Sequence, residues 1–301
     1  GDPFWSRYNR SFMGVALLWL GRIPEAIALA QGVVDEARLA GDPALEGFGL
    51  TDVGFGRAFT GDADAARATA SAALSIVSDV AGVQPFNHAV LALAALGRGD
   101  PAEARRECEA ALAATNPLGV MRNSSLLHGI IPMAQAAMAC GDLIGARQCA
   151  DETVTRVAGA HQVAALAVRA RVAIAQGELI QAERDAHAAL AAAAETAGLL
   201  SVPDAFECLA MLTDDDPQRA ARLLGAAVGI RERTQEVRCR LFDEDHDQTL
   251  TRVREALAEK TFDQCYSEGK ALSTTEAIGF AQRGRGERKR PAAGWESLTP
   301  A

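Results

Sequence analysis

The chain has 301 residues, of which 49% are hydrophobic and 5% aromatic, and its formal net charge at pH 7 is −9. An acidic balance of this size argues against nucleic-acid binding by the body of the chain, because attraction to phosphate needs a basic surface. The sequence opens without a signal peptide and holds no apolar run of about 20 residues that could span a membrane. We therefore expect a cytoplasmic protein with six reduced cysteines, none of them in a CxxC pair.

A recurring frame organises the first 230 residues. Turn residues recur at intervals of 36 to 42 positions, at Gly21, Gly61, Gly99, Gly141, Gly177 and Asp215. An alanine stands five positions after each turn residue, and a glycine, alanine or cysteine stands seven positions before it. Self-similarity at this period is typical of stacked helix pairs, and small side chains at a crossing let two helices approach closely. We predict a positive φ at the turn glycines.

The frame predicts six helix pairs in chain order. The first helices cover about residues 4–20, 44–59, 84–97, 122–140, 160–176 and 202–213. The second helices cover about residues 24–40, 63–80, 101–114, 143–158 and 179–197, with a sixth that begins at 217. Pro24, Pro101 and Pro217 suit the first turn of a second helix, where the missing N–H has no intrahelical acceptor.

This succession of a small residue, a turn glycine and an alanine resembles the tetratricopeptide repeat. The unit here is about five residues longer than the standard 34, and alanine stands at most of the aromatic positions of that motif. The resemblance covers roughly residues 4–230 and implies an all-α solenoid, a right-handed superhelix of about six helix pairs. Such an array offers an extended binding surface rather than a buried catalytic centre.

After about residue 230 the register changes, and we predict a short helical extension. Its three helices are expected over residues 249–257, 262–268 (ended by Gly269) and 277–282. Ser273 and Glu276 have the spacing of a capping box before the last of these helices. The predicted domains are thus a repeat array over 1–230 and capping helices over 231–282.

Residues 283–301 are predicted to form a basic linker. They carry five basic and two acidic residues, a net charge of +3 that leaves −12 for the rest of the chain. The candidate phosphate contacts are Arg283, Arg285, Arg288, Lys289 and Arg290. A plain linker is the favoured interpretation, because runs of like charge are usually solvated.

The sequence lacks the common signatures of catalysis. No lysine precedes Lys260, which excludes a G-x-x-x-x-G-K-[ST] phosphate loop there, and we interpret the glycine-rich residues 47–56 as close helix packing. The five histidines form no H-x-x-x-H pair, and no G-x-S-x-G elbow occurs. Acidic residues 214–216 and 243–245 fit the charge preference of helix N-termini. We expect no catalytic residue, no metal and no cofactor in this segment.

The tetratricopeptide resemblance also implies a concave wall built from the first helices, at positions 13, 10, 6 and 3 before each turn residue. The more prominent members of this groove are Tyr8, Ser11, Phe48, Thr51, Phe55, Phe86, His128, Gln135, Met138 and Arg171. Apolar anchors with a few polar groups suit a small-molecule inducer or a protein segment. Packing against a neighbouring domain explains them equally well. Of these residues, His128 and Arg171 are the expected partners of an anionic ligand.

Several motifs near the C-terminus follow one another in an informative order. They are RLLGAA at 222–227, RVREAL at 252–257, Phe262, Tyr266, Gly269, LS at 272–273, EAI at 276–278 and GWESLTP at 294–300. Their order resembles the segment before the DNA-binding domain in large ATP-dependent bacterial regulators of the LuxR type. The resemblance implies an ATPase module upstream and a helix-turn-helix downstream. Both lie outside this sequence, which we expect to begin and end inside a longer protein.

We therefore expect the sensor or coupling region of a transcriptional regulator. It would bind an inducer or a partner protein and link the ATPase to the DNA-binding domain, so DNA would be bound only through that downstream domain. The alternative is a stand-alone tetratricopeptide-like scaffold for protein–protein interaction. An enzyme is the least favoured class. The coding sequence after residue 301 discriminates between the first two.

Overall fold

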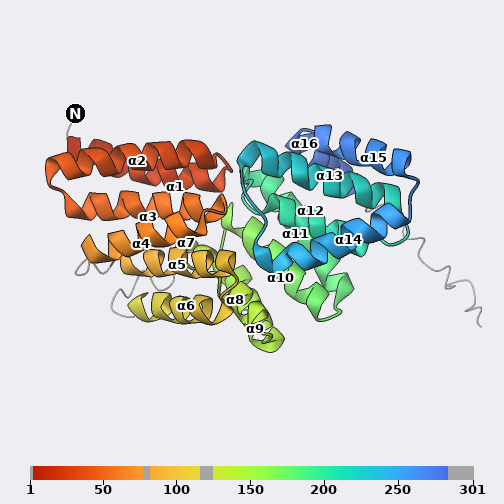
Figure 1. The fold of residues 1–301 in the computed structure, drawn as a ribbon, viewed down its shortest axis with the longest axis horizontal. Coiled ribbons are helices and arrows are strands. Elements are labelled where there is room, and N and C mark those ends of the chain that lie inside the picture. Colours follow the sequence, from red (N-terminus) through yellow and green to blue (C-terminus); the bar gives the residue numbers. More distant parts are fainter. Residues whose placement is uncertain (1–2, 77–81, 116–124, 284–301) are drawn as a thin grey trace, which may run out of the picture.

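The computed structural model describes residues 3–76, 82–115 and 125–283 (Figure 1). Every regular element within these ranges is helical, which confirms the all-α expectation. The N-terminal group of helices comprises α1 (Pro3–Trp19), α2 (Ile23–Ala40), α3 (Pro43–Phe59), α4 (Ala63–Ile76), α5 (Gln84–Arg98) and α6 (Pro101–Thr115). Three helices follow, namely α7 (Ser125–Ile130), α8 (Met133–Ala139) and α9 (Leu143–Arg156).

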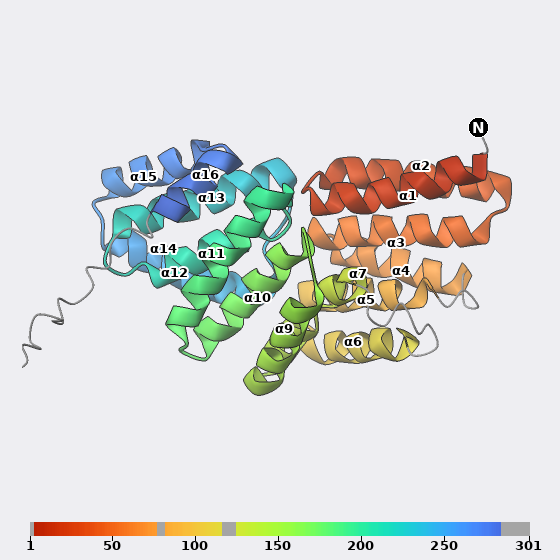
Figure 2. The same cartoon turned by 180° about the vertical axis from the view of Figure 1, so that it is seen from behind.

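A C-terminal group completes the fold. Its helices are α10 (His161–Ala175), α11 (Leu179–Thr196), α12 (Val202–Leu212), α13 (Pro217–Thr234), η2 (Arg240–Phe242), α14 (Asp243–Glu255), α15 (Glu259–Ala271) and α16 (Thr274–Arg283). Figure 2, seen from behind, shows α9 between the two groups. The predicted boundary at residue 230 falls inside α13.

Neighbouring helices pack in pairs, and small residues set their spacing. The alanines five positions after the turn residues are all buried, with at most 1% exposure: Ala26, Ala66, Ala104, Ala146, Ala182 and Ala220. A Cβ added to Gly14 would lie 3.9 Å from the Ala26 carbonyl oxygen, and one added to Gly54 would lie 3.8 Å from that of Ala66. The two small positions of a pair therefore face each other, as the frame predicts.

The turn glycines close the first helix of each pair. Gly21, Gly61, Gly99, Gly141 and Gly177 all have φ between +72° and +81°, which confirms the prediction of left-handed backbone at these positions. In the sixth pair, the Asp216 side chain accepts a hydrogen bond from the Arg219 N–H at 2.9 Å and caps α13.

The fourth pair departs from the predicted pattern. One continuous helix over 122–140 is wrong, because Pro132 separates α7 from α8. Proline has no N–H for the helical ladder, and its backbone leaves the helical region at φ −81° and ψ +48°. The break lets Ile130 and Ile131 reach the core of the N-terminal group.

The C-terminal extension contains both confirmed and corrected predictions. The capping box is confirmed: the Glu276 carboxylate accepts from the Ser273 N–H at 2.9 Å, and the Ser273 hydroxyl accepts from the Glu276 N–H at 3.3 Å. The helix expected from 249 begins earlier, at Asp243, where three acidic residues occupy the first turn. Acidic side chains in the first turn interact favourably with the positive end of the helix dipole, which agrees with the interpretation from the sequence.

The sequence predicted that Gly269 ends a helix, but this glycine lies inside α15. A Cβ added there would lie 2.0 Å from the carbonyl oxygen of Arg222 in α13. Gly225 and Gly229 of α13 approach the α15 backbone as closely, with added Cβ atoms 2.0 Å from the Tyr266 oxygen and 2.3 Å from the Lys270 oxygen. Glycine is therefore used here for a backbone-to-backbone crossing and not as a stop signal.

The two groups of helices meet at a seam of hydrogen bonds, in which the Trp19 carbonyl accepts from both the Leu199 N–H and the Leu200 N–H. Each of them ends on the carbonyl of the last residue of α1, α3 or α5, which has no donor within its own helix. The carbonyls of Trp19, Phe59 and Arg98 accept from the Leu199 N–H at 3.0 Å, the Val237 N–H at 2.8 Å and the Arg240 guanidinium at 3.3 Å, respectively. The C-terminal group thus docks on the helix ends of the N-terminal group (Figure 1).

Candidate functional site

A cavity of about 440 Å³ lies among α1, α3 and α5 of the N-terminal group. The chain has ten phenylalanines, three tryptophans and two tyrosines, and seven of these fifteen line the cavity among the described residues. They are Tyr8, Phe12, Trp19, Phe48, Phe55, Phe59 and Phe86. Almost half of the aromatic side chains of an aromatic-poor protein therefore surround one space, which we call the aromatic cavity.

Helical periodicity brings these side chains to one face. On α3, Phe48, Asp52, Phe55 and Phe59 follow one another at spacings of three or four residues, which place side chains one above another. The Phe55 and Phe59 rings stack with centroids 6.3 Å apart. On α1, the Tyr8 ring meets that of Phe12 edge-on at 4.9 Å.

The polar part of the wall centres on Asp52. This side chain is 6% exposed and accepts a hydrogen bond of 2.8 Å from the Ser11 hydroxyl, which ties α3 to α1. Burial raises the pKa of Asp52 to about 7, and the hydrogen bond from Ser11 acts in the opposite direction. Next to it, the Thr51 hydroxyl donates to the Gly47 carbonyl at 2.8 Å. The cavity therefore combines apolar aromatic walls with a carboxyl group that titrates near neutral pH.

The structure brings six of the ten predicted groove residues together in this cavity. They are Tyr8, Ser11, Phe48, Thr51, Phe55 and Phe86, from the first helices of pairs one to three. Asp52, Phe12, Trp19 and Phe59 line it as well but were not predicted. An acidic residue amid the apolar stretch of residues 47–56 is the signal that marks Asp52.

The glycines of that stretch do pack closely, since a Cβ on Gly56 would lie 2.3 Å from Ile27.

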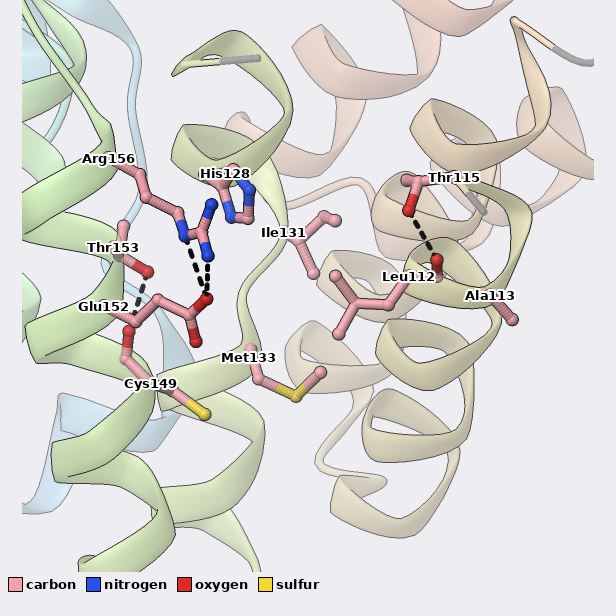
Figure 3. A pocket seen from close by; sticks show the side chains of 10 residues that line it. All are labelled: Leu112, Ala113, Thr115, His128, Ile131, Met133, Cys149, Glu152, Thr153 and Arg156. Atoms are coloured by element: carbon pink, nitrogen blue, oxygen red, sulfur yellow. Dashed lines mark hydrogen bonds and ion pairs between the residues drawn. The ribbon is translucent and has the colours of Figure 1, made fainter. Parts of the chain in front are cut away.

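His128 lies in a second cavity, of about 410 Å³, between α6 and α9 (Figure 3). Arg156 points toward the same space, but its guanidinium pairs with Glu152 at 2.8 Å. Leu112, Ile131 and Met133 form the apolar side. The neighbouring Glu152 carboxylate reduces the attraction of this guanidinium for an anion.

The two remaining predicted members of pair four lie elsewhere. Gln135 and His128 border a narrow space of about 60 Å³ next to Ile130. Met138 is partly buried and packs against the small core of Ala134, Ala137 and Val172. Neither residue belongs to the lining of the aromatic cavity among the described residues.

Arg171 does not line a groove. It is 2% exposed, donates to Glu207 at 2.6 Å and lies over the Phe242 ring at 4.5 Å from its centroid. The prediction that Arg171 and His128 bind a ligand together is therefore wrong, because the Arg171 guanidinium is buried and paired with Glu207 inside the C-terminal group. A charged residue in the apolar sequence of α12 is the signal that marks Glu207 as its buried partner.

Glu207 is the centre of a buried ion cluster. Arg238 donates to the Glu207 carboxylate at 2.9 Å. The Arg231 guanidinium lies 3.4 Å from the Glu207 carboxylate and 2.8 Å from that of Asp204, and so bridges the two acids. Burial opposes the ionisation of Glu207, but the surrounding arginines outweigh it, Arg231 most strongly, and lower its pKa to about 2. The cluster joins α10, α12, α13 and the segment before η2.

The nearby Glu236 has the opposite character. Its carboxyl group is buried and accepts the Ser201 N–H at 3.0 and 3.2 Å. Burial raises the pKa of Glu236 to about 8, although the charge of Arg231 acts in the opposite direction. Glu236 stands beside Val237 and Ser201 beside Leu200, so this bond holds together the two segments that form the seam.

Of the candidate phosphate contacts, Arg283 is the exposed last residue of α16. Arg285, Arg288, Lys289 and Arg290 lie outside the described residues. Within the described ranges, no helix has the length and apolar character needed to cross a membrane. The same ranges contain no cluster of three or more side chains suited to holding a metal ion.

Comparison with known proteins gives similarity along the whole chain. No protein-family model matches it. Proteins of Mycobacterium bovis and of two strains of Mycobacterium tuberculosis are 42% identical to it over 303 aligned residues, which cover 100% of this chain. All three are provisionally named HTH-type transcriptional regulators. The chain spans 34% of the length of each of these relatives. The chain is therefore similar to one part of proteins that carry this name.

Proposed function

We propose that this chain is the sensor and coupling region of a LuxR-type transcriptional regulator. Its helix pairs form a tetratricopeptide-like array that binds an inducer or a partner protein. The array then links an upstream ATPase module to a downstream DNA-binding domain. The observation that carries the proposal is the 42% identity, along the whole chain, to proteins named as HTH-type regulators, of which this chain matches 34%.

A structural relationship supports the coupling role. Trp19 and Phe59 both belong to the lining of the aromatic cavity, and their carbonyl oxygens accept hydrogen bonds of the seam. A ligand that repositions either ring acts on a residue that also anchors the C-terminal group. A ligand shifts such an equilibrium only by its difference in affinity for the two states. The aromatic cavity and the seam therefore form one mechanical unit in this proposal.

The other activities belong to the flanking domains in this proposal. ATP is bound by the upstream module and DNA by the downstream helix-turn-helix, and no residue of this chain is assigned to either. The basic residues from Arg283 onward lead toward the DNA-binding domain as a linker. No cofactor is proposed for this segment.

The first test reads the gene on both sides of the chain. A recognition helix encoded after residue 301 and a nucleotide-binding loop encoded before residue 1 are the expected result. A stop codon directly after residue 301 would contradict the proposal and favour a stand-alone scaffold.

The second test uses the complete parent protein and a reporter for a promoter that it binds. Gly21→Ala strains the seam, because the new Cβ meets Leu199 and Thr234 at 2.8 Å each. Gly141→Ala imposes the same left-handed backbone strain, but no atom lies within 4 Å of its Cβ. We expect the first variant to change the ratio of induced to basal transcription and the second to preserve it. If both variants have the same ratio of induced to basal transcription, the seam does not take part in the coupling.

A further inference from the structure

The residues that line the aromatic cavity indicate the charge and the size of its ligand, which the proposed function leaves open. Its volume of about 440 Å³ lies within the range of small-molecule sites, roughly 300–1,000 Å³. Seven of the fourteen described residues that line it are aromatic, and Asp52 is the one residue among the fourteen with an ionisable carboxyl group. No lysine, arginine or histidine is part of that lining. An anion would find no counter-charge there.

We propose that the aromatic cavity binds an organic cation, an ammonium group carried on an apolar body, with Asp52 as its counter-ion. This inference rests on the proposed function for its biological meaning but not for its chemistry. The faces of Phe, Tyr and Trp carry negative electrostatic potential and attract a cation within about 6 Å of the ring centre. The apolar body of the ligand then replaces water along the remaining wall.

The surroundings of Asp52 favour this charge type. The groups that face the cavity around it are the Ser11 hydroxyl and the Tyr8 ring from α1, Thr51 from α3 and the Phe86 ring from α5. Among the described residues, none of these supplies a positive charge. A buried carboxylate without a cation is costly, so an ammonium group that enters the cavity removes that cost and gains the ion pair.

A purely structural role for Asp52 makes a different prediction. Its bond to Ser11 ties α1 to α3, and an asparagine in its place can accept the same hydrogen bond through its amide oxygen. If the tie is the whole role of Asp52, Asp52→Asn leaves ligand binding unchanged. If Asp52 is the counter-ion, the same variant weakens the binding of cations selectively.

The experiment compares three probes of one shape on the 301-residue chain. They are 4-phenylbutylammonium, 4-phenylbutanol and 4-phenylbutanoate, and binding is followed by calorimetry and by tryptophan fluorescence, since Trp19 lies in the wall. We expect the ammonium to bind about tenfold more tightly than the alcohol, and the carboxylate most weakly. Equal binding of ammonium and alcohol, tighter binding of the carboxylate, or no binding of the ammonium up to its solubility limit overturns the proposal. This comparison needs no variant.

Variants then locate the site. Asp52→Asn should weaken the ammonium about tenfold and the alcohol by less than about twofold, and Phe48→Leu should weaken the ammonium about threefold. The control is Glu25→Gln, which removes an exposed carboxylate of α2 outside the cavity lining and should leave all three affinities unchanged. Loss of ammonium binding in the control, or none in Asp52→Asn, overturns the assignment to Asp52.

The pH profile gives an independent readout. Ammonium affinity should rise from pH 6 to pH 8 as Asp52 ionises, and Asp52→Asn should abolish that rise. A rise that persists in Asp52→Asn contradicts the counter-ion role. Should the chain bind the ammonium as expected while the seam variants leave transcription unchanged, the ligand class stands and the proposed coupling function fails.

Discussion

The carbonyl oxygen of Trp19 accepts the N–H of Leu199 at 3.0 Å, so the end of the first helix is bonded to the loop between α11 and α12. The same residue belongs to the lining of the aromatic cavity, and the centroid of its indole lies 4.1 Å from that of the His161 ring. One residue therefore contacts the proposed ligand space, the seam and the start of α10. Predictions about the seam follow from this arrangement.

Gly21→Ala should destabilise the chain more than Gly141→Ala. Both glycines have φ above +70°, so alanine costs about 1–2 kcal/mol at either position. Only the Cβ at 21 meets other atoms, at 2.8 Å from Leu199 and Thr234, which should add about 1 kcal/mol or more. Urea denaturation measures both free energies of unfolding. Equal losses would show that the C-terminal group does not press on this turn.

Glu207→Gln should lower the free energy of unfolding by about 3–5 kcal/mol, because it leaves the buried arginines around it without their shared carboxylate. The control is Glu25→Gln, which removes the partner of Arg22 in a fully exposed pair and should leave the unfolding midpoint unchanged. Thermal unfolding followed by circular dichroism compares the two. A loss at Glu207 no larger than at Glu25 would contradict the picture of a buried charge cluster.

Glu236 should make stability fall as pH rises. Its pKa is about 8 in the folded chain and therefore above its usual value, so the folded state holds a proton that the unfolded state has released. Its contribution is complete below about pH 4.5 and is lost as pH rises through about 8, by at most roughly 1.4 kcal/mol per pH unit. Compared with Glu236→Gln, the wild-type chain should lose stability across this window. A constant difference between the two proteins would show that Glu236 is ionised in the folded state.

Gly269→Ala and Gly32→Ala should have opposite effects. Gly32 lies in α2 with no atom within 4 Å of an added Cβ, so alanine should stabilise the chain by about 0.4–1 kcal/mol. At Gly269 the Cβ would lie 2.0 Å from the Arg222 carbonyl oxygen, which forces α15 away from α13 at a cost of about 2 kcal/mol or more. Chemical denaturation of both variants tests the crossing. Stabilisation by Gly269→Ala would exclude it.

The sequence predicted those features that depend on neighbouring residues along the chain. The turn glycines, the capping box at Ser273 and the buried alanines five positions after each turn were all correct, because local backbone geometry and helical period determine them. Gly269 shows the limit of such reasoning. A glycine late in a helix suits a stop signal and a close crossing equally well, and only the distant Arg222 decides between them.

The candidate site was predicted in part for the same reason. Counting positions along the first helices found Phe48 and Phe55 but assigned Arg171 to the same wall. The position of a residue on a helix predicts the direction of its side chain but not which residue it contacts. The side chain of Arg171 contacts the buried Glu207. Trp19 escaped the count because it stands two positions before Gly21, and only the positions 13, 10, 6 and 3 before each turn residue were counted.

The seam also constrains how such a protein can change during evolution. Open repeat arrays gain and lose units easily, because each unit touches only its neighbours. Here Arg240 bonds to Arg98, 142 residues away, and Leu199 bonds to the end of the first helix. One additional helix pair between them would move these partners out of register. We therefore expect the seam to disfavour the insertion or loss of a helix pair between these partners, and relatives to vary in the outer turns rather than in the number of pairs.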